Sequence, residues 1–526
     1  MQIIGTGFGA AQGTSYVSFG STKAAEYSLW SDTSIQVKVP RGVPETVNVT
    51  VTTSGGTSNA VAFTVLQYVV GFAEGYTGTG FQEYLCIGNM QNVAVPAFIG
   101  FLYSDGTVDS TNVTVPANSR VTIDVNIAAG TGEEVSALVF SDLQLVVERP
   151  MYFNYNGRWT GGSDVIASPY ISKYWLFAEG YTGTGFDEWV CVLNTNETAT
   201  ANLTFHFQTK GKGEIDKTAS VAPKSRKSFK VNDLLGADNE CSLLLESDQV
   251  IVAERSMYFD YSGKGANHWE GGHCVMGLPF PSTEYYFAEG CTRTGFEEWI
   301  TLQNPDTKPI TVNAMYQLGP GQGGPVPKIY TVPAESRYTI YVADDVGTEK
   351  DVSVKLTSDD YFVAERPMYF RYMGYGANYE GGHCVIGAMS TSADWFFAEG
   401  YTGPGFQEWL CLQNPGDQDS LVEIHYLGKS GVIAVKQVTV EARSRKTVRV
   451  NDNAGQNLEL SCHIVVVSGP PIVAERPMYF NFHGWDGGHD VIGHYPESYV
   501  LSSATVKAAE SQGAALLKNQ PWDWLH

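Results

Sequence analysis

Apolar and polar residues alternate in short stretches along almost the whole chain, and glycine-rich or polar turns separate these stretches. Alternation with a period of two is typical of strands that bury one face, and the close turns leave no room for long helices. From residue 174 to residue 281, the pattern predicts a strand over 186–194, hairpin segments over 199–210 and 214–231, two more strands within 241–261 and a returning segment over 268–281. We therefore expect an antiparallel two-sheet sandwich from this stretch.

Nearly the same stretch occurs four times. Its opening block, FAEG, starts at Phe72, Phe177, Phe287 and Phe397. Its closing block, which contains MYF, starts at Val146, Val252, Val363 and Val473. Four nearly equal active sites in one chain would be unusual for an enzyme, whereas structural and adhesive proteins repeat a module to gain length, surface or valency. We therefore expect a protein that is not an enzyme.

The repeats divide the chain into six segments. We predict a small sandwich over 1–67, repeats over 68–171, 172–282, 283–392 and 393–496, and a helical tail over 497–526. The predicted fold class is all-β, a tandem array of antiparallel immunoglobulin-like β-sandwich modules with a short C-terminal helix. Because the linkers between the repeats are short, we expect the array to be a stiff rod.

The segment before the repeats has its own motifs, GTGFG at 5–9, VSFG at 17–20 and WSDTSIQVKVP at 30–40, followed by an alternating stretch over 47–65. In this order they resemble the IPT/TIG domain, an immunoglobulin-like module common in bacterial surface proteins. The resemblance implies that the first strand of the sandwich, which normally precedes GTGFG, is missing. Either the sequence is truncated, or a neighbouring subunit supplies the strand.

The repeats also resemble a known group. FAEG, AERPMYF and GGHDVIG or GGHCVIG, in this order, are similar to tandem repeats of uncharacterised bacterial secreted or cell-envelope proteins, particularly those of actinobacterial type. The resemblance covers Val69 to Tyr495. It implies an extracellular or cell-surface location and brings no established activity.

Charge narrows the range of partners. The 526 residues carry a formal net charge of −23, so phosphate backbones and anionic lipids would repel the protein, and nucleic acid is excluded as a partner. No apolar run approaches the roughly 20 residues of a membrane span. The amino terminus lacks the charged and apolar regions of a signal peptide, so we expect that an export signal has been removed or that the sequence is a fragment.

Eight cysteines offer a test of the compartment. Aligning the repeats places Cys86, Cys191, Thr301 and Cys411 in one column, and Val135, Cys241, Val352 and Cys462 in another. Repeats two and four have both cysteines and repeat three has neither, so we predict disulfides that join Cys191 to Cys241 and Cys411 to Cys462 across the core. Cys291 is left to bond either Cys274 or Cys384, and Cys86 is a buried thiol or an intermolecular link. Such disulfides would imply an oxidising compartment.

Charged residues recur at fixed places in every repeat. In repeat two they are Glu179, Glu188, Arg226, Glu254, Arg255 and His273. Paired carboxylates could serve glycoside hydrolysis, and glutamates with a histidine could hold a metal. We favour a structural Glu–Arg network, because unpaired buried charge is costly. Ser163 replaces the histidine in repeat one, which weakens the metal hypothesis, so we predict no catalytic residue, no metal ligand and no cofactor, with calcium as the ion left open.

The aromatic residues and the C-terminal tail are further candidates for contacts with a ligand or with another subunit. Rings beside carboxylates are typical of sugar-binding modules, although rings at a module boundary more often fill the junction between modules. An alanine-rich stretch over 502–519 predicts a short helix. After it, Trp522, Trp524 and Leu525 are expected to dock on the last repeat or to contact the next subunit.

These observations favour a non-catalytic extracellular structural protein. As a stiff multi-domain rod, it would assemble end to end with other copies of itself into a cell-surface filament or layer, or act as an adhesin stalk. The alternative is a multivalent glycan-binding protein of the cell wall.

Overall fold

The structure is a computed structural model that describes residues 1–40, 46–64, 68–264 and 267–496. The predicted tail, with its helix and with Trp522, Trp524 and Leu525, lies outside the described residues. Strands dominate the described chain, and its helices have only four or five residues each, so the predicted all-β class is confirmed. Over these same residues, no helix is both long enough and apolar enough to cross a membrane. The chain forms two compact units, the first being Met1–Tyr68 and the second beginning at Val69.

The first unit is a sandwich of two sheets. One sheet has the order β1-β5-β4, and the other has the order β3-β2-β6-β7 with β8 paired to β6. The strands are β1 (Gln2–Ile4), β2 (Tyr16–Phe19), β3 (Thr22–Lys23), β4 (Tyr27–Trp30), β5 (Ser34–Val37), β6 (Thr46–Thr53), β7 (Gly56–Thr57) and β8 (Val61–Thr64). Val17, Ile35 and Val49 from the two sheets meet in its core.

Repeats one and two contain the following elements. Repeat one has β9 (Tyr68–Phe72), β10 (Phe81–Asn89), β11 (Val95–Tyr103), β12 (Val108–Val115), β13 (Ser119–Asp124), α1 (Val125–Ala128), β14 (Val135–Ser141), β15 (Val146–Glu148), β16 (Met151–Tyr155) and β17 (Trp159–Ser163). Repeat two has β18 (Ser172–Phe177), β19 (Phe186–Asn194), β20 (Ala201–Thr209), β21 (Gly213–Val221), β22 (Ser225–Lys230), α2 (Val231–Leu235), β23 (Cys241–Ser262) and β24 (His268–Met276).

Repeats three and four have the same order of elements. Repeat three has β25 (Ser282–Phe287), β26 (Phe296–Asn304), β27 (Ile310–Leu318), β28 (Val326–Val332), β29 (Ser336–Tyr341), α3 (Val342–Val346), β30 (Val352–Gly374) and β31 (Ala377–Ile386). Repeat four has β32 (Asp394–Phe397), β33 (Phe406–Asn414), β34 (Ser420–Gly428), β35 (Gly431–Val440), β36 (Ser444–Arg449), α4 (Val450–Asn453), β37 (Ser461–Ser468), β38 (Val473–Glu475), β39 (Met478–Phe482) and β40 (Trp485–His489).

Each repeat folds as two antiparallel sheets that share one long strand or its interrupted equivalent. In repeat two this strand is β23, whose first half pairs with β18 and β20 in an outer sheet. Its second half pairs with β19 and β24 in an inner sheet. Val190 and Val192 of the inner sheet pack against Leu203 and Phe205 of the outer sheet, so the alternation read from the sequence does build a sandwich core.

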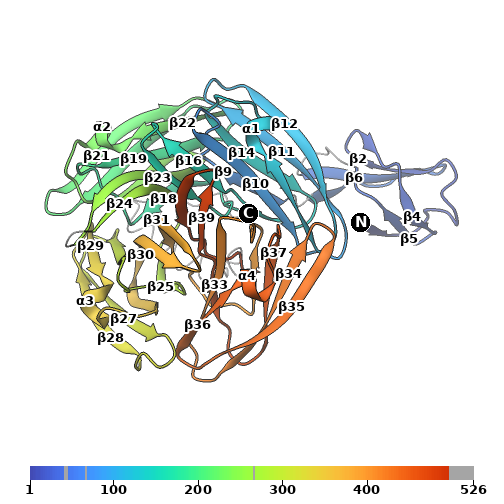
Figure 1. The fold of residues 1–526 in the computed structure, drawn as a ribbon. Helices are drawn as coiled ribbons and strands as arrows, with labels where there is room; N and C mark the ends of the chain where they lie inside the picture. The colour runs from blue at the N-terminus through green and yellow to red at the C-terminus, as the bar shows by residue number, and fades with distance from the viewer. Residues whose placement is uncertain (41–45, 65–67, 265–266, 497–526) are drawn as a thin grey trace. The chain divides into compact units, whose positions relative to one another are not determined.

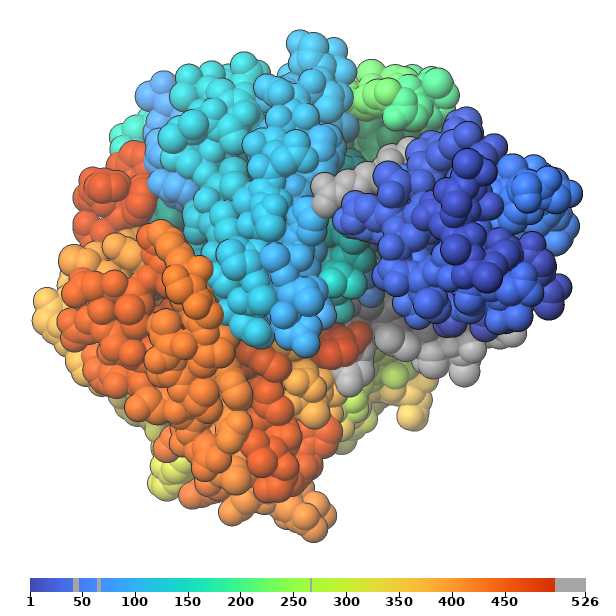
Figure 2. All heavy atoms as spheres, turned by 90° about the vertical axis from the view of Figure 1, so that its right-hand side faces the viewer, coloured from blue at the N-terminus to red at the C-terminus, as the bar shows by residue number. Residues whose placement is uncertain are grey.

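The last strands of the four repeats, β17, β24, β31 and β40, pack against one another around a common axis, and β40 also contacts β17. A pair of glycines on each strand permits this close approach. A Cβ atom added at Gly487 would lie 2.8 Å from Cα of Gly161, and one at Gly271 would lie 3.3 Å from Cα of Gly381. The repeats therefore form a closed ring in which repeat one lies against repeat four (Figures 1 and 2).

The predicted rod is therefore wrong. The repeats belong to one compact unit and are not sandwiches strung in series. The physical reason is that the inner sheet of a repeat buries both of its faces between neighbours. On β23, for example, Glu254 pairs with an arginine of repeat one, and the adjacent Arg255 pairs with a glutamate of repeat three.

Candidate functional site

The ER dipeptides of the four repeats form a closed circle of ion pairs. The arginine of each repeat pairs with the glutamate of the next: Arg149 with Glu254 at 2.8 Å, Arg255 with Glu365 at 2.8 Å, Arg366 with Glu475 at 3.0 Å and Arg476 with Glu148 at 3.2 Å. Neighbouring residues on a strand point to opposite faces, so the glutamate of one dipeptide contacts the preceding repeat and the arginine contacts the following repeat. All eight side chains are at most 1 % exposed.

Backbone groups complete these buried pairs. Each glutamate also accepts a hydrogen bond from the alanine N–H of a FAEG block: Glu254 from Ala73, Glu365 from Ala178 and Glu475 from Ala288, all at 2.7 Å, and Glu148 from Ala398 at 3.0 Å. A buried charge is tolerated when an opposite charge and hydrogen bonds satisfy it. The carboxylates are therefore structural anchors of the junctions.

A second circle joins the same repeats. The arginine that follows a serine on β13, β22 or β29 pairs with the FAEG glutamate of the preceding repeat: Arg120 with Glu399 at 3.0 Å, Arg226 with Glu74 at 3.4 Å and Arg337 with Glu179 at 3.0 Å. In repeat four, Arg445 donates to the carbonyl groups of Gly290 and Val352 at 2.7 Å. Of the six charged residues singled out in repeat two, four pair with residues of neighbouring repeats: Glu179, Arg226, Glu254 and Arg255. The fifth, Glu188, accepts a hydrogen bond from the Tyr181 N–H at 2.9 Å, in the loop beside the junction. Burial raises the pKa of Glu188 to about 7.

The sixth residue, His273, lies near the axis with His383 and His489. They are at most 3 % exposed, and no ring nitrogen among them has a hydrogen-bond partner in the described chain. Burial, reinforced by a neighbouring arginine, lowers the pKa of each imidazole well below its usual value. The rings are therefore neutral near pH 7.

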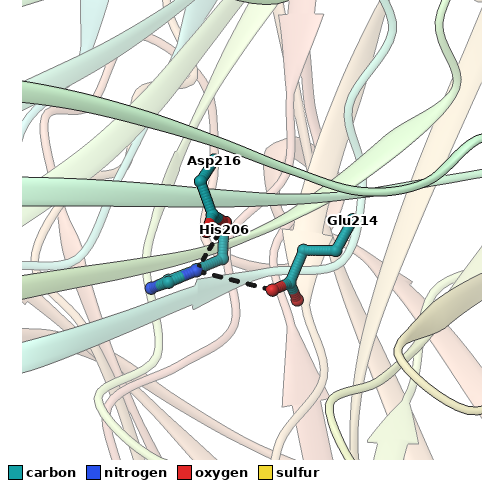
Figure 3. Close-up of side chains that lie close together, drawn as sticks. All are labelled: His206, Glu214 and Asp216. Carbon is teal, nitrogen blue, oxygen red and sulfur yellow. Dashed lines mark hydrogen bonds and ion pairs between the residues drawn. The ribbon is translucent and has the colours of Figure 1, made fainter.

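Clusters that could ligate a cation occur elsewhere. Among the described residues, the converging groups are His206 with Glu214 and Asp216, and Asp260 with His268 and Glu270. In the first group, Nδ1 of His206 lies 2.8 Å from Asp216 and 3.6 Å from Glu214 (Figure 3). Neither group contains a residue of the Glu–Arg–His set predicted from the repeats. An exposed hydrogen-bonded pair of histidine and carboxylate accounts for the first group without a metal ion.

All eight cysteines are free thiols, so the structure does not contain the predicted disulfides. Cys191 lies on the face of β19 that is turned towards repeat one, where its thiol contacts Glu74, whereas Cys241 packs in the core of repeat two. In repeat four, Leu460 and not Cys462 is equivalent to Cys241. Its carbonyl accepts a hydrogen bond from Arg120, just as the carbonyl of Cys241 accepts one from Arg337.

The column that paired the cysteines was therefore misaligned in repeat four. Cys291, Cys274 and Cys384 are free as well, and the thiols of Cys274 and Cys384 donate to Glu254 and Glu365 at 3.2 and 3.3 Å. Cys411 and Cys462 do not bond each other either. Without disulfides, the cysteines do not support an oxidising compartment.

Two clefts open at opposite junctions of the ring. The 2/3 cleft, between repeats two and three, has a volume of about 680 Å³ and is lined in part by Tyr181, Lys210, Glu240, Tyr261, Trp299 and Arg337. The 4/1 cleft, between repeats four and one, has a volume of about 500 Å³ and is lined in part by Tyr401, Lys429, Glu459, Phe482, Tyr84 and Arg120. Each residue of the first group has its structural equivalent at the same place in the second.

The two clefts share their ion pairs as well. In each, a lysine pairs with a glutamate at 2.9 Å: Lys210 with Glu240, and Lys429 with Glu459. Strand register places Ser104 and Gly319 at the lysine position in repeats one and three. The lysine therefore distinguishes these two junctions from the other two.

Lys210 and Lys429 were not predicted as site residues, because a lysine occupies this position in only two of the four repeats. The junctions themselves did leave a signal in the sequence. Glutamate and arginine side by side in a buried strand point to opposite faces, so a partner must cover each face.

Comparison with known protein families identifies two segments of the chain. Residues 1–65 match the IPT/TIG domain, which confirms the immunoglobulin-like domain predicted at the N-terminus. Residues 379–474 match a family of unknown function (DUF5719). None of the curated proteins matches the chain. No catalytic family is among these matches, and an IPT/TIG domain joined to an all-β repeat body fits a multi-domain structural or adhesive role.

Three solved structures are similar to parts of the chain. Thermotoga maritima 1070 is 19 % identical over 20 % of this chain and 93 % of its own, with a TM-score of 0.18. The Anabaena sensory rhodopsin transducer is 22 % identical over 16 % of this chain and 88 % of its own, with a TM-score of 0.15. A tetra-tandem repeat from the extending region of a large adhesion protein is 12 % identical over 85 % of this chain and 95 % of its own, with a TM-score of 0.10. Such low TM-scores have no bearing on the function.

Proposed function

We propose that this protein is a non-catalytic, multivalent binding protein of the bacterial cell surface, in which the ring of four repeats is an adhesive head. One observation carries the proposal: the charged residues that recur in every repeat are held in buried ion pairs between repeats. These residues build junctions and are not available as a general acid and base. The surface location is supported by the IPT/TIG domain.

A ring with repeated junctions is suited to multivalent binding. Two junctions carry equivalent clefts, and two weak sites on one rigid body can hold a repetitive ligand far more strongly than one site alone. Self-assembly by stacking of repeats has no such support, because every repeat in the ring is already covered by a neighbour on both sides.

Adherence of the full chain to cells tests this function. Antibody against the ring is applied to intact cells of the source organism, and beads coated with the full chain are incubated with the same cells. We expect antibody labelling without permeabilisation and retention of the beads, with beads carrying heat-denatured chain as the control. Labelling that requires permeabilisation, or equal retention of both kinds of bead, would contradict the proposal.

A further inference from the structure

We infer that the 2/3 and 4/1 clefts each bind a neutral pyranose unit of a glycan chain. This inference rests on the proposed function, because it names the ligand of the adhesive head. The clefts measure about 680 and 500 Å³, within the range of about 300–1,000 Å³ that is typical of small-molecule sites.

The aromatic lining suits the flat face of a sugar ring. Trp299 in the 2/3 cleft and Tyr84 in the 4/1 cleft are half-buried and hold equivalent positions on β26 and β10. Tyr181 and Tyr401 are likewise equivalent and half-buried. Rings of this kind offer a large, rigid and partly polar contact area at a low cost in conformational entropy. The apolar C–H face of a pyranose can lie against them.

The polar groups suit hydroxyls. Each cleft has a Lys–Glu pair and an Arg–Glu pair, with N–O distances of 2.9 and 3.0 Å. Ammonium and guanidinium groups donate hydrogen bonds and carboxylates accept them, and a sugar hydroxyl does both. Because each charge already has a partner, an ionic ligand would have to break a pair, and one charge would then lose its partner. A neutral sugar interacts with both members and leaves the pair intact.

Both clefts are shared by two repeats. Tyr181 and Lys210 come from repeat two, whereas Trp299 and Arg337 come from repeat three. A sugar in this cleft contacts both repeats and so stabilises the junction by linkage. Binding should therefore raise the unfolding temperature of the ring as well as retain the protein on a glycan.

Affinity electrophoresis measures the binding directly. The full chain is run in native gels that contain dextran, mannan or xylan as neutral probes, and carboxymethyl dextran as the anionic counterpart. We expect retardation by at least one neutral polysaccharide. The double variant Trp299→Ala/Tyr84→Ala should weaken this binding by about tenfold or more, as expected for the loss of an aromatic anchor.

The chain offers a matched control. Trp189 and Trp409 hold the same strand position at the other two junctions, so Trp189→Ala/Trp409→Ala should leave retardation unchanged. A second test variant, Lys210→Met/Lys429→Met, changes largely exposed side chains and should also weaken binding. Mobility in a sugar-free gel and the melting temperature show whether each variant is folded.

The outcomes test the location of the site, the charge of the ligand and the glycan inference separately. Retardation that survives in both test variants overturns the clefts as the sites and leaves the adhesive function standing. Stronger retardation by carboxymethyl dextran overturns the neutral ligand. If no neutral polysaccharide retards the protein, the glycan inference fails, and the adherence of coated beads to cells then decides the proposed function separately.

Discussion

The guanidinium group of Arg476 lies 3.2 Å from the carboxylate of Glu148, and this pair joins the last repeat to the first. Arg149 and Glu254 form the same pair between consecutive repeats at 2.8 Å. The contact that closes the ring is therefore one more copy of the contact that links each repeat to the next.

Breaking the closing pair should cost as much as breaking an internal one. We expect Arg476→Met and Arg366→Met each to lower the free energy of unfolding by about 3–5 kcal/mol, because each leaves a buried glutamate and a buried aspartate without their arginine. Urea unfolding followed by fluorescence measures this. The exposed pair of Arg371 and Glu380 provides a control, and Arg371→Met should cost less than about 1 kcal/mol. An Arg476→Met variant as stable as this control would show that repeats one and four do not meet.

Glycine at the axis should be intolerant of a side chain. A Cβ atom at Gly487 would lie 2.8 Å from Cα of Gly161, and backbone cannot move aside cheaply. We expect Gly487→Ala to lower the free energy of unfolding by about 1–3 kcal/mol, the usual cost of overpacking. Gly324 has nothing within 4 Å of the added atom, so Gly324→Ala should be neutral or slightly stabilising. Equal melting temperatures for the two variants would argue against the tight axis.

Stability should fall as the pH rises through neutrality. Burial raises the pKa of Glu298 from 4.5 to about 8, so the folded state keeps a proton that the unfolded state releases. The resulting stability is fully present below pH 4.5 and is lost as the pH rises towards 8, at up to about 1.4 kcal/mol per pH unit. Glu298→Gln is neutral at every pH and should make this slope shallower without removing it, because burial also raises the pKa of Glu83 and Glu408 to about 8; urea midpoints measured across the range show the change. An unchanged slope would mean that Glu298 does not contribute to the pH dependence.

Thiol chemistry should show eight free cysteines. The thiols are buried, and burial raises the pKa of Cys191, Cys241, Cys411 and Cys462 well above the usual value. They should therefore react slowly with a thiol reagent in the native state and completely after unfolding. Dithiothreitol should leave the melting temperature unchanged. A titre of four thiols, together with a lower melting temperature in reductant, would restore the disulfides.

The sequence was sufficient to predict the strands and the repeated charged residues, since both follow from local alternation and from the period of the copies. It did not predict the ring, because the rod was inferred from the short linkers between repeats. A short linker limits the distance between two successive repeats but does not set the angle between them. The angle between repeats is set by close contacts between glycines at the axis, such as that of Gly487 with Gly161. A glycine pair in a strand is equally typical of a bulge or a bend.

The candidate site was predicted only in part. Glu254 and Arg255 were recognised as members of a structural network, but their partners lie in different repeats, which an alignment of the repeats with one another cannot reveal. Cys462 was placed in the wrong column, because Leu460 holds the position equivalent to Cys241. The clefts require residues of two repeats at once, such as Lys210 and Trp299, so only the folded ring shows them.

Small-angle X-ray scattering of the full chain tests the closed ring most directly. A compact chain of this length has a radius of gyration of about 24 Å, and we expect a value below about 30 Å that does not change with protein concentration. Four sandwiches in series would extend over more than about 130 Å and give about 40 Å or more. The lower value is the result that the ring predicts, and the higher value would contradict it.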